Sequence, residues 1–197
     1  MLNKGVCVRM VYLCHKPLLE GEKVVLRPFE NKDLPFIEVC LKDPEVIKLT
    51  GSNLDFDKEK ESIHHWYNTR NEQTDRLDLA IIDKCQGIPV GEVVINLYDK
   101  KSHSMNFRIL IGSKGRNRGL GTEATQLIID YIFINTTLNQ LTLSVFDFNP
   151  RAKHVYVKVG FVKDSIDENE LEFEETWIDS INMKLTRENW LKRKSLL

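Results

Sequence analysis

A predicted strand, a glycine-rich turn and a predicted helix follow one another in the middle of the chain, and this succession constrains the fold most. The apolar run at 107–111 predicts the strand, and apolar residues at helical spacing predict the helix over 120–135. Between them, the turn carries Arg116, Arg118, Gly119 and Gly121. Glycine lets a backbone approach a ligand closely, and the first N–H groups of a helix have no partners within it. The segment therefore predicts a site for a phosphorylated ligand.

Periodic apolar residues predict the elements on either side of this turn. A helix is expected from Asn31 or Asp33 to about residue 41, where Asp43 and Pro44 break the pattern. Further helices are expected at 57–71 and 149–159, the latter closed by Gly160, and after Thr186. Strands are expected at 23–28, 77–83, 90–98, 104–111, 141–146, 161–166 and 172–185. Two short connections, at 84–89 and 99–102, favour an antiparallel meander.

This order predicts an α+β (mixed α/β) fold, in which helices flank one mixed, mostly antiparallel sheet. With 197 residues, the chain is expected to form a single domain over 21–190. A loosely ordered extension is expected at 1–20 and a short tail at 191–197.

Composition narrows the class of protein. The net charge of −1 gives no support for nucleic-acid binding, and no apolar run reaches the length that a membrane span needs. The cysteines are scattered, with no histidines at zinc spacing, which predicts reduced thiols, a cytoplasmic location and no metal.

Three phosphate-binding loops compete for the glycine turn. A Walker loop needs lysine and then serine or threonine after its last glycine, but Thr122 and Glu123 follow Gly121. A dinucleotide fold is favoured by the G-x-G-x-x-A match over 119–124 and by Asp147 after the next predicted strand. However, a meander precedes the motif and too little chain follows it. A NAD-binding domain therefore stays only as an alternative.

The third loop is an acyl-CoA pyrophosphate loop. Arg116, Gly119 and Gly121 resemble the R/Q-x-x-G-x-G/A signature of the Gcn5-related N-acetyltransferase (GNAT) family. A second family block, N-x-x-A-x-x-x-Y-x-x-x-G-F, is matched by Asn149, Ala152, Tyr156, Gly160 and Phe161. The element order over 23–185 also resembles the family fold. The segments 26–28 and 179–185 resemble its ribosomal-protein-alanine and polyamine N-acetyltransferase branch.

The resemblance implies direct acetyl transfer from acetyl-CoA, as co-substrate, to a primary amine in a ternary complex. It implies a sheet splayed around the donor, with a strand N–H near Leu110 facing the thioester oxygen. Tyr156 is expected to protonate the leaving thiolate, although a merely packed aromatic is the alternative. Asn149 is expected at the donor arm, as a helix N-cap, or as both. The full set of donor-binding residues implied is Ile109, Leu110, Ile111, Arg116, Arg118, Gly119, Leu120, Gly121, Thr122, Asn149, Ala152 and Tyr156.

The general base and the acceptor are less defined. Relatives often have glutamate at the position of Asn106, which cannot accept a proton from an ammonium group. Glu92 is a candidate base acting through water, and an exposed strand carboxylate is its alternative. The alternative function is therefore a catalytically impaired module that binds acyl-CoA.

An acidic run at 167–175 suits a cationic acceptor such as a polyamine, a lysine or a protein N-terminus, or is simply a solvated hairpin. Relatives often dimerise, so a homodimer is an open expectation.

Overall fold

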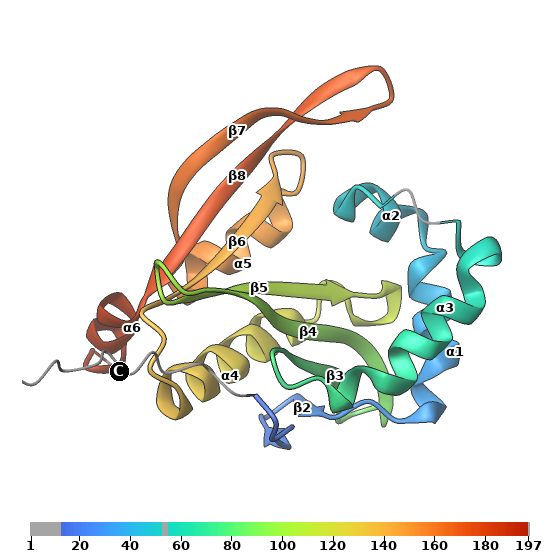
Figure 1. Cartoon of the computed structure of the whole chain (residues 1–197), viewed down its shortest axis with the longest axis horizontal. Helices are drawn as coiled ribbons and strands as arrows, with labels where there is room; N and C mark the ends of the chain where they lie inside the picture. The colour runs from blue at the N-terminus through green and yellow to red at the C-terminus, as the bar shows by residue number, and fades with distance from the viewer. Residues whose placement is uncertain (1–12, 53–54, 197) are drawn as a thin grey trace, which may run out of the picture.

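The structure is a computed structural model that describes residues 13–52 and 55–196. Within these residues, eight strands form one sheet in the order β1-β2-β3-β4-β5-β6-β8-β7 (Figure 1). The strands are β1 (Leu19–Glu20), β2 (Val24–Arg27), β3 (Leu77–Asp83), β4 (Ile88–Asp99), β5 (Ser104–Ile111), β6 (Gln140–Phe146), β7 (Val162–Phe173) and β8 (Thr176–Thr186). Every neighbouring pair is antiparallel except β5 and β6. The predicted fold class and the meander of β3, β4 and β5 are confirmed.

Helices cover both faces of the sheet. They are α1 (Leu34–Leu41), α2 (Pro44–Thr50), α3 (Phe56–Thr69), α4 (Leu120–Asn135), α5 (Pro150–Val159) and α6 (Arg187–Lys194), with 3-10 turns η1 (Asn31–Asp33), η2 (Arg70–Glu72) and η3 (Ser113–Gly115). No helix in the described part of the chain is long and apolar enough to cross a membrane.

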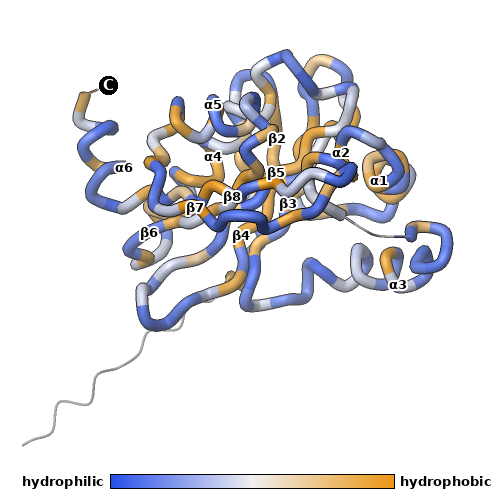
Figure 2. The backbone as a smooth tube through the Cα atoms, turned by 90° about the horizontal axis from the view of Figure 1, so that it is seen from above, coloured by the Kyte–Doolittle hydropathy of each residue, from blue (hydrophilic) through white to orange (hydrophobic). Residues whose placement is uncertain are grey.

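Side-chain alternation along β3 divides the core between the two faces. Leu79 and Ile81 are fully buried in the main core, which also contains the apolar face of α4. Ala80 and Ile82 belong to a smaller cluster with Ile37 of α1, on the opposite face. Figure 2 shows that hydrophobic residues are concentrated along the central strands and hydrophilic residues lie toward the outside. The meander is therefore packed between α4 on one face and α1 and α3 on the other.

The parallel pairing of β5 with β6 is short. It joins Ser104 to Gln140, Met105 to Leu141 and Asn106 to Thr142, and it ends there. The rest of β5 remains paired with β4 as far as Ile111. The two strands therefore diverge at Phe107, as the resemblance implies for this sheet.

Several predicted boundaries need correction. Asp43 and Pro44 do not only end a helix, because Asp43 caps the next one, α2, by accepting a hydrogen bond from the Glu45 N–H at 2.9 Å. Asp55 rather than Asp57 caps α3. The strands predicted at 161–166 and 172–185 form a longer hairpin, whose turn residues Glu174 and Glu175 have φ of 48° and 61°. Positive φ at both central residues is the geometry of a two-residue hairpin turn.

The chain ends are less separate than predicted. Leu13 is buried in the main core and donates its N–H to the Thr74 carbonyl at 2.9 Å, and β1 pairs with β2. Residues 1–12 of the predicted extension lie outside the described residues. At the other end, α6 crosses the predicted boundary at 190, and Trp190 is buried. The domain limits predicted at 21 and 190 stay a proposal. The contacts of Leu13 and of α6 favour wider limits at both ends.

Gly91 in β4 should tolerate no side chain. A Cβ there would lie 2.2 Å from the Leu110 carbonyl oxygen, a backbone atom that cannot turn away. We expect Gly91→Ala to lower the free energy of unfolding by about 2 to 3 kcal/mol, measured by urea denaturation. The control is Gly87→Ala in the β3–β4 turn, where nothing lies within 4 Å and only a positive φ is strained, at a cost of about 1 kcal/mol. Equal losses in the two variants would contradict the steric argument.

Candidate active site

The divergence of β5 and β6 opens a cleft of about 580 Å³. Its walls come from β5, β6, the glycine turn, α5 and one face of α2. Most of the predicted donor-binding residues line it: Ile109, Leu110, Ile111, Arg116, Gly119, Gly121, Thr122, Asn149, Ala152 and Tyr156. Two blocks of sequence separated by a helix and a strand are thus brought to one cavity.

The phosphate-binding end lies at the N-terminus of α4. Gly119 precedes the helix with φ of 78°, which favours glycine, and no side chain caps the first turn. Glu123 does not cap it either, because its carboxylate accepts hydrogen bonds from the Lys23 N–H. A Cβ at Gly121 would lie 3.2 Å from the Ile111 side chain. The helix end therefore offers unpaired N–H donors to an anion in the cleft.

The two arginines of the turn point in different directions. Arg116 lines the cleft, and its guanidinium contacts Asp43 at 2.8 Å and Glu45 at 2.6 Å. Arg118 instead contacts the buried Asp83 at 2.6 Å, and this contact lowers the Asp83 pKa.

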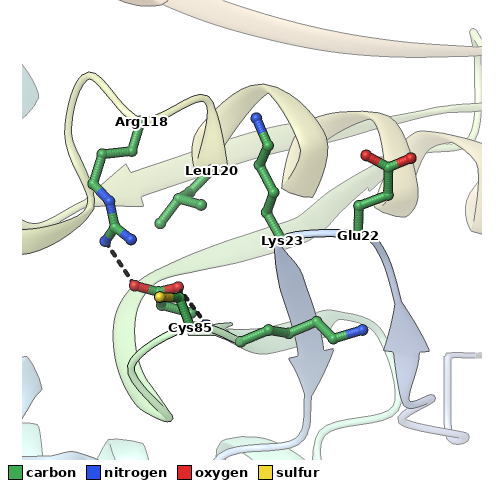
Figure 3. A pocket seen from close by; sticks show the side chains of 7 residues that line it. Glu22, Lys23, Cys85, Arg118 and Leu120 are labelled. Atoms are coloured by element: carbon green, nitrogen blue, oxygen red, sulfur yellow. Dashed lines mark hydrogen bonds and ion pairs between the residues drawn. The ribbon is translucent and has the colours of Figure 1, made fainter.

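Arg118 lines a separate pocket of about 490 Å³. Figure 3 shows it there together with Lys23 and Cys85. The Leu120 side chain is buried between this pocket and the core. Arg118 and Leu120 can therefore serve the predicted phosphate site only through their backbone N–H groups.

The register of β5 decides which of its N–H groups face the cleft. Gly112 donates its N–H to the Val90 carbonyl at 2.9 Å. Hydrogen-bonded pairs alternate along an antiparallel ladder, so Leu110, opposite Glu92 in the same register, also points its backbone groups at β4. Ile109 and Ile111 then point theirs toward the diverging β6. The N–H of Leu110 therefore points at β4, and the hydrogen-bond donor predicted near Leu110 can come only from Ile109 or Ile111.

Tyr156 lies at the closed end of the cleft. Its side chain is 6% exposed, and its ring packs against Phe107 and Phe161 at centroid distances of 6.0 Å. Burial raises the pKa of Tyr156 to about 12. Its hydroxyl has no hydrogen-bond partner among the described residues, and it is not among their fully buried unpaired atoms. The ring is therefore packed, as the alternative drawn from the sequence expects, and the acid role of the hydroxyl stays a prediction.

Asn149 has the predicted capping role. Its side-chain oxygen accepts a hydrogen bond from the Ala152 N–H at 3.1 Å, and Pro150 occupies the first position of α5. Asn149 and Ala152 also line the cleft. The cap thus holds the start of α5, and with it Tyr156, against the divergent strands.

Glu92 is not an exposed strand carboxylate, contrary to the alternative drawn from the sequence. Its side chain is 14% exposed and accepts hydrogen bonds from Arg70 at 2.9 Å and from the Tyr67 hydroxyl at 3.0 Å. Arg70 is fully buried and also contacts Asp78 at 2.7 Å. Burial alone would lower the Arg70 pKa, but Glu92 and Asp78 raise it above its ordinary value. Arg70 and Tyr67 therefore hold the Glu92 side chain in place at the cleft wall.

Sequence reasoning missed one wall of the cleft. Val46, Leu49 and Thr50 of α2 line it, and so does Arg151 of α5. The available signal was Pro44 at the first position of a helix, directly after an N-capping aspartate. Asn106 lines the cleft and bonds Asn96 at 3.3 Å. No group of acidic, histidine or cysteine side chains in the described residues is arranged to hold a metal ion.

Known proteins resemble this chain in sequence and fold. A model of the acetyltransferase (GNAT) domain matches residues 23–162. An N-acetyltransferase 9-like protein of Caenorhabditis briggsae is 26% identical over 153 residues, 72% of this chain and 75% of the relative. Spermidine N(1)-acetyltransferase of Escherichia coli (strain K12) is 26% identical over 142 residues, 72% of this chain and 74% of the relative. The structure of spermidine N-acetyltransferase from Vibrio cholerae in complex with CoA and spermine has a TM-score of 0.74 at 21% identity, covering 87% of this chain and 99% of its own.

The chain therefore belongs to the GNAT acetyltransferase family. The family, the fold class and the activity predicted from the sequence, acetyl transfer to an amine by an acyltransferase, are confirmed. A NAD-binding domain and a catalytically impaired module are not favoured.

Tyr156 should make the fold sensitive to alkali. Its pKa is about 12 in the folded protein against an ordinary value of 10.0. The folded state thus keeps a proton that the unfolded state loses, so stability is complete below about pH 10 and falls as pH rises to 12. Two pKa units correspond to about 2 to 3 kcal/mol. We expect urea denaturation from pH 9 to 12 to show a shallower loss in Tyr156→Phe than in the wild type.

Burial also raises the pKa of Tyr67, so Tyr156→Phe should retain part of the slope. Parallel curves for the wild type and Tyr156→Phe would contradict the assignment.

Proposed function

We propose that the protein transfers acetyl from acetyl-CoA to a primary amine that carries positive charge, such as a polyamine or a protein N-terminus. The observation that carries this proposal is the cleft between β5 and β6, with the start of α4 at one end and Tyr156 at the other. An elongated donor with phosphates at one end and a thioester at the other fits that order.

The donor fits the chemistry of the walls. The N–H groups at the start of α4 and the Arg116 guanidinium suit the pyrophosphate. The unpaired backbone of β5 suits the amide-bearing pantetheine arm, which can pair with it as an added strand. Side chains of Asn149 and Ala152 flank this path. In this proposal, backbone groups of the protein bind acetyl-CoA along most of its length.

The Ile109 N–H is our candidate for the thioester oxygen. Of the two N–H groups that point toward β6, it lies nearer along β5 to Phe107, whose ring contacts Tyr156. A donor aimed at the carbonyl oxygen stabilises negative charge as the amine adds to the carbon. The C–N bond forms in this step, and the C–S bond then breaks.

Tyr156 is our candidate for stabilising the departing sulfur. A phenol with a pKa of about 12 is a weaker acid than an alkyl thiol, whose pKa is about 8.5. Full proton transfer to the thiolate is thus uphill, and we modify the predicted role to hydrogen-bond donation. The thiolate can then leave as an anion or take a proton from solvent.

The amine must lose its proton before it attacks. Asn106 cannot accept it, and Glu92 already accepts hydrogen bonds from Arg70 and Tyr67. We propose that Glu92 acts electrostatically, drawing a cationic amine to the cleft, and that water removes the proton. A carboxylate of 14% side-chain exposure can still orient such a water.

One feature beside the cleft favours a cationic acceptor. Phe146 lines the cleft and stacks on Phe148, and the ammonium of Lys48 lies 5.7 Å from the Phe148 ring and 5.0 Å from that of Phe173. Lys48 therefore already contacts these aromatic faces. The β7–β8 hairpin beside them carries the acidic run. The names of the spermidine acetyltransferases agree with such an acceptor.

A cytoplasmic location belongs to the same proposal. Cys14, Cys40 and Cys85 are free thiols, which suits a reducing compartment. A homodimer remains a prediction.

Removing the Tyr156 hydroxyl should slow turnover without weakening donor binding. We expect Tyr156→Phe to lower kcat by about ten- to a hundredfold, because the hydroxyl meets sulfur only as charge develops. The KM for acetyl-CoA should change less than twofold, since the ring packing stays. Thiol release with spermidine as acceptor measures both. Tyr131→Phe in α4 is the control and should leave both unchanged; equal kcat in the two variants would remove Tyr156 from the chemistry.

Charge on the acceptor should raise its reactivity. We expect spermidine and lysine-rich N-terminal peptides to show a higher kcat/KM than monoamines of similar length. The advantage should shrink in about 0.5 M salt, where screening shortens the range of the acidic hairpin's field to a few Å. Thiol release across an acceptor panel at two salt concentrations measures this. A preference for neutral or monocationic acceptors at low salt would refute it.

A further inference from the structure

Glu45 of α2 joins two arginines that come from different elements and both line the cleft. Its carboxylate contacts Arg116 of the glycine turn at 2.6 Å and Arg151 of α5 at 2.5 Å. Both arginines line the donor cleft together with Gly119 and Gly121. In Figure 1, α2 stands opposite the loop between β6 and α5. A carboxylate thus lies between two guanidiniums beside the open N-terminus of α4.

All three nitrogens of the Arg116 guanidinium already donate a hydrogen bond in this arrangement. Its Nε contacts the Ile111 carbonyl at 3.3 Å, and its two terminal nitrogens contact Asp43 and Glu45. A phosphate that takes the N–H groups now bound by Asp43 or Glu45 must displace that carboxylate. Asp43 is fixed, because its other oxygen caps α2. Glu45 has the longer side chain, which is 42% exposed, so it is the group that can swing away.

The simpler explanation is that Glu45 compensates the dipole of α2, as acidic residues in a first turn often do. That role asks only for a carboxylate near the helix start. Glu45 instead bridges two elements that lie 71 and 106 residues away in the sequence. Bridging two guanidiniums is how a phosphate group would bind there.

We propose that Glu45 occupies the position of a donor phosphate, and that Arg116 and Arg151 together form that phosphate site. This inference rests on acetyl-CoA being the donor. Glu45 competes with the incoming phosphate for both guanidiniums, so it sets the affinity for phosphorylated donors. Arg151 is a second specificity-determining residue, contributed by the helix that also carries Tyr156.

The test compares two acetyl donors that differ in their phosphates. We expect Glu45→Gln to lower the KM for acetyl-CoA by about three- to tenfold, because an amide competes poorly for guanidinium. The KM for S-acetylpantetheine, which has no pyrophosphate, should stay unchanged. A disturbance of α2 would move both values. Glu59→Gln, also in the first turn of its helix and exposed, is the matched control and should alter neither.

Arg151→Gln supplies the second arm. It should raise the KM for acetyl-CoA, and the rise should be larger in the Glu45→Gln background, where the guanidinium is free to bind phosphate. S-acetylpantetheine should again be unaffected. Thermal stability of each variant shows whether the fold is intact.

The outcomes are separable from the proposed function. If the wild type uses neither acetyl-CoA nor S-acetylpantetheine with any amine, the proposed donor is wrong. If the wild type uses acetyl-CoA but Glu45→Gln leaves its KM unchanged or raises it, only this inference is overturned. An equal change with both donors overturns it as well.

Discussion

The site depends on the point at which β5 and β6 separate. The parallel ladder ends at Asn106, and the next residue, Phe107, places its ring against those of Tyr156 and Phe161. These rings fill the corner between the strands and the helix α5. The backbone beyond Phe107 then has a partner on one side only. These aromatic contacts thus lie where the strands separate, and they hold the tyrosine at the closed end of the cleft.

The opposite wall is held by buried charge. Arg70 lies over the rings of Phe29 and Tyr67 at 4.2 Å and 4.4 Å and contacts Asp78 and Glu92. Its Nε is a buried donor without a partner among the described residues. Such a network is costly to desolvate and adds rigidity more than stability. Its effect is to fix the carboxylate of Glu92 at the cleft, where a freely exposed carboxylate would move.

Much of this arrangement could be predicted from the sequence, because local patterns encode it. The meander follows from short turns, α4 from its apolar period, and the two ends of the cleft from two motifs. The missed features have physical reasons. Pro44 ends one helix but begins another, and the hairpin turn at Glu174 and Glu175 lacks the glycine or asparagine that usually marks it.

Direction was harder to predict than position. Arg118 has the right place in the motif, yet its side chain turns to a buried carboxylate that lies far away in sequence. Which alternate backbone groups of β5 point toward the cleft, those of Ile109 and Ile111, depends on the pairing of β5 with β4. The residue types of the strand do not encode it. The contact of Glu45 with two distant arginines depends on tertiary structure in the same way.

The alternation of β5 separates two kinds of evolutionary change. The backbone groups of Ile109 and Ile111 point toward the cleft, whereas the side chains of Arg108 and Leu110 share the face of Glu92 and α3. Substitutions on that face leave the N–H and carbonyl groups of the strand where they are. A lineage can therefore change that face residue by residue while the backbone along the cleft is inherited unchanged, and descendants of one such chain can keep the cleft while differing in the side chains beside it.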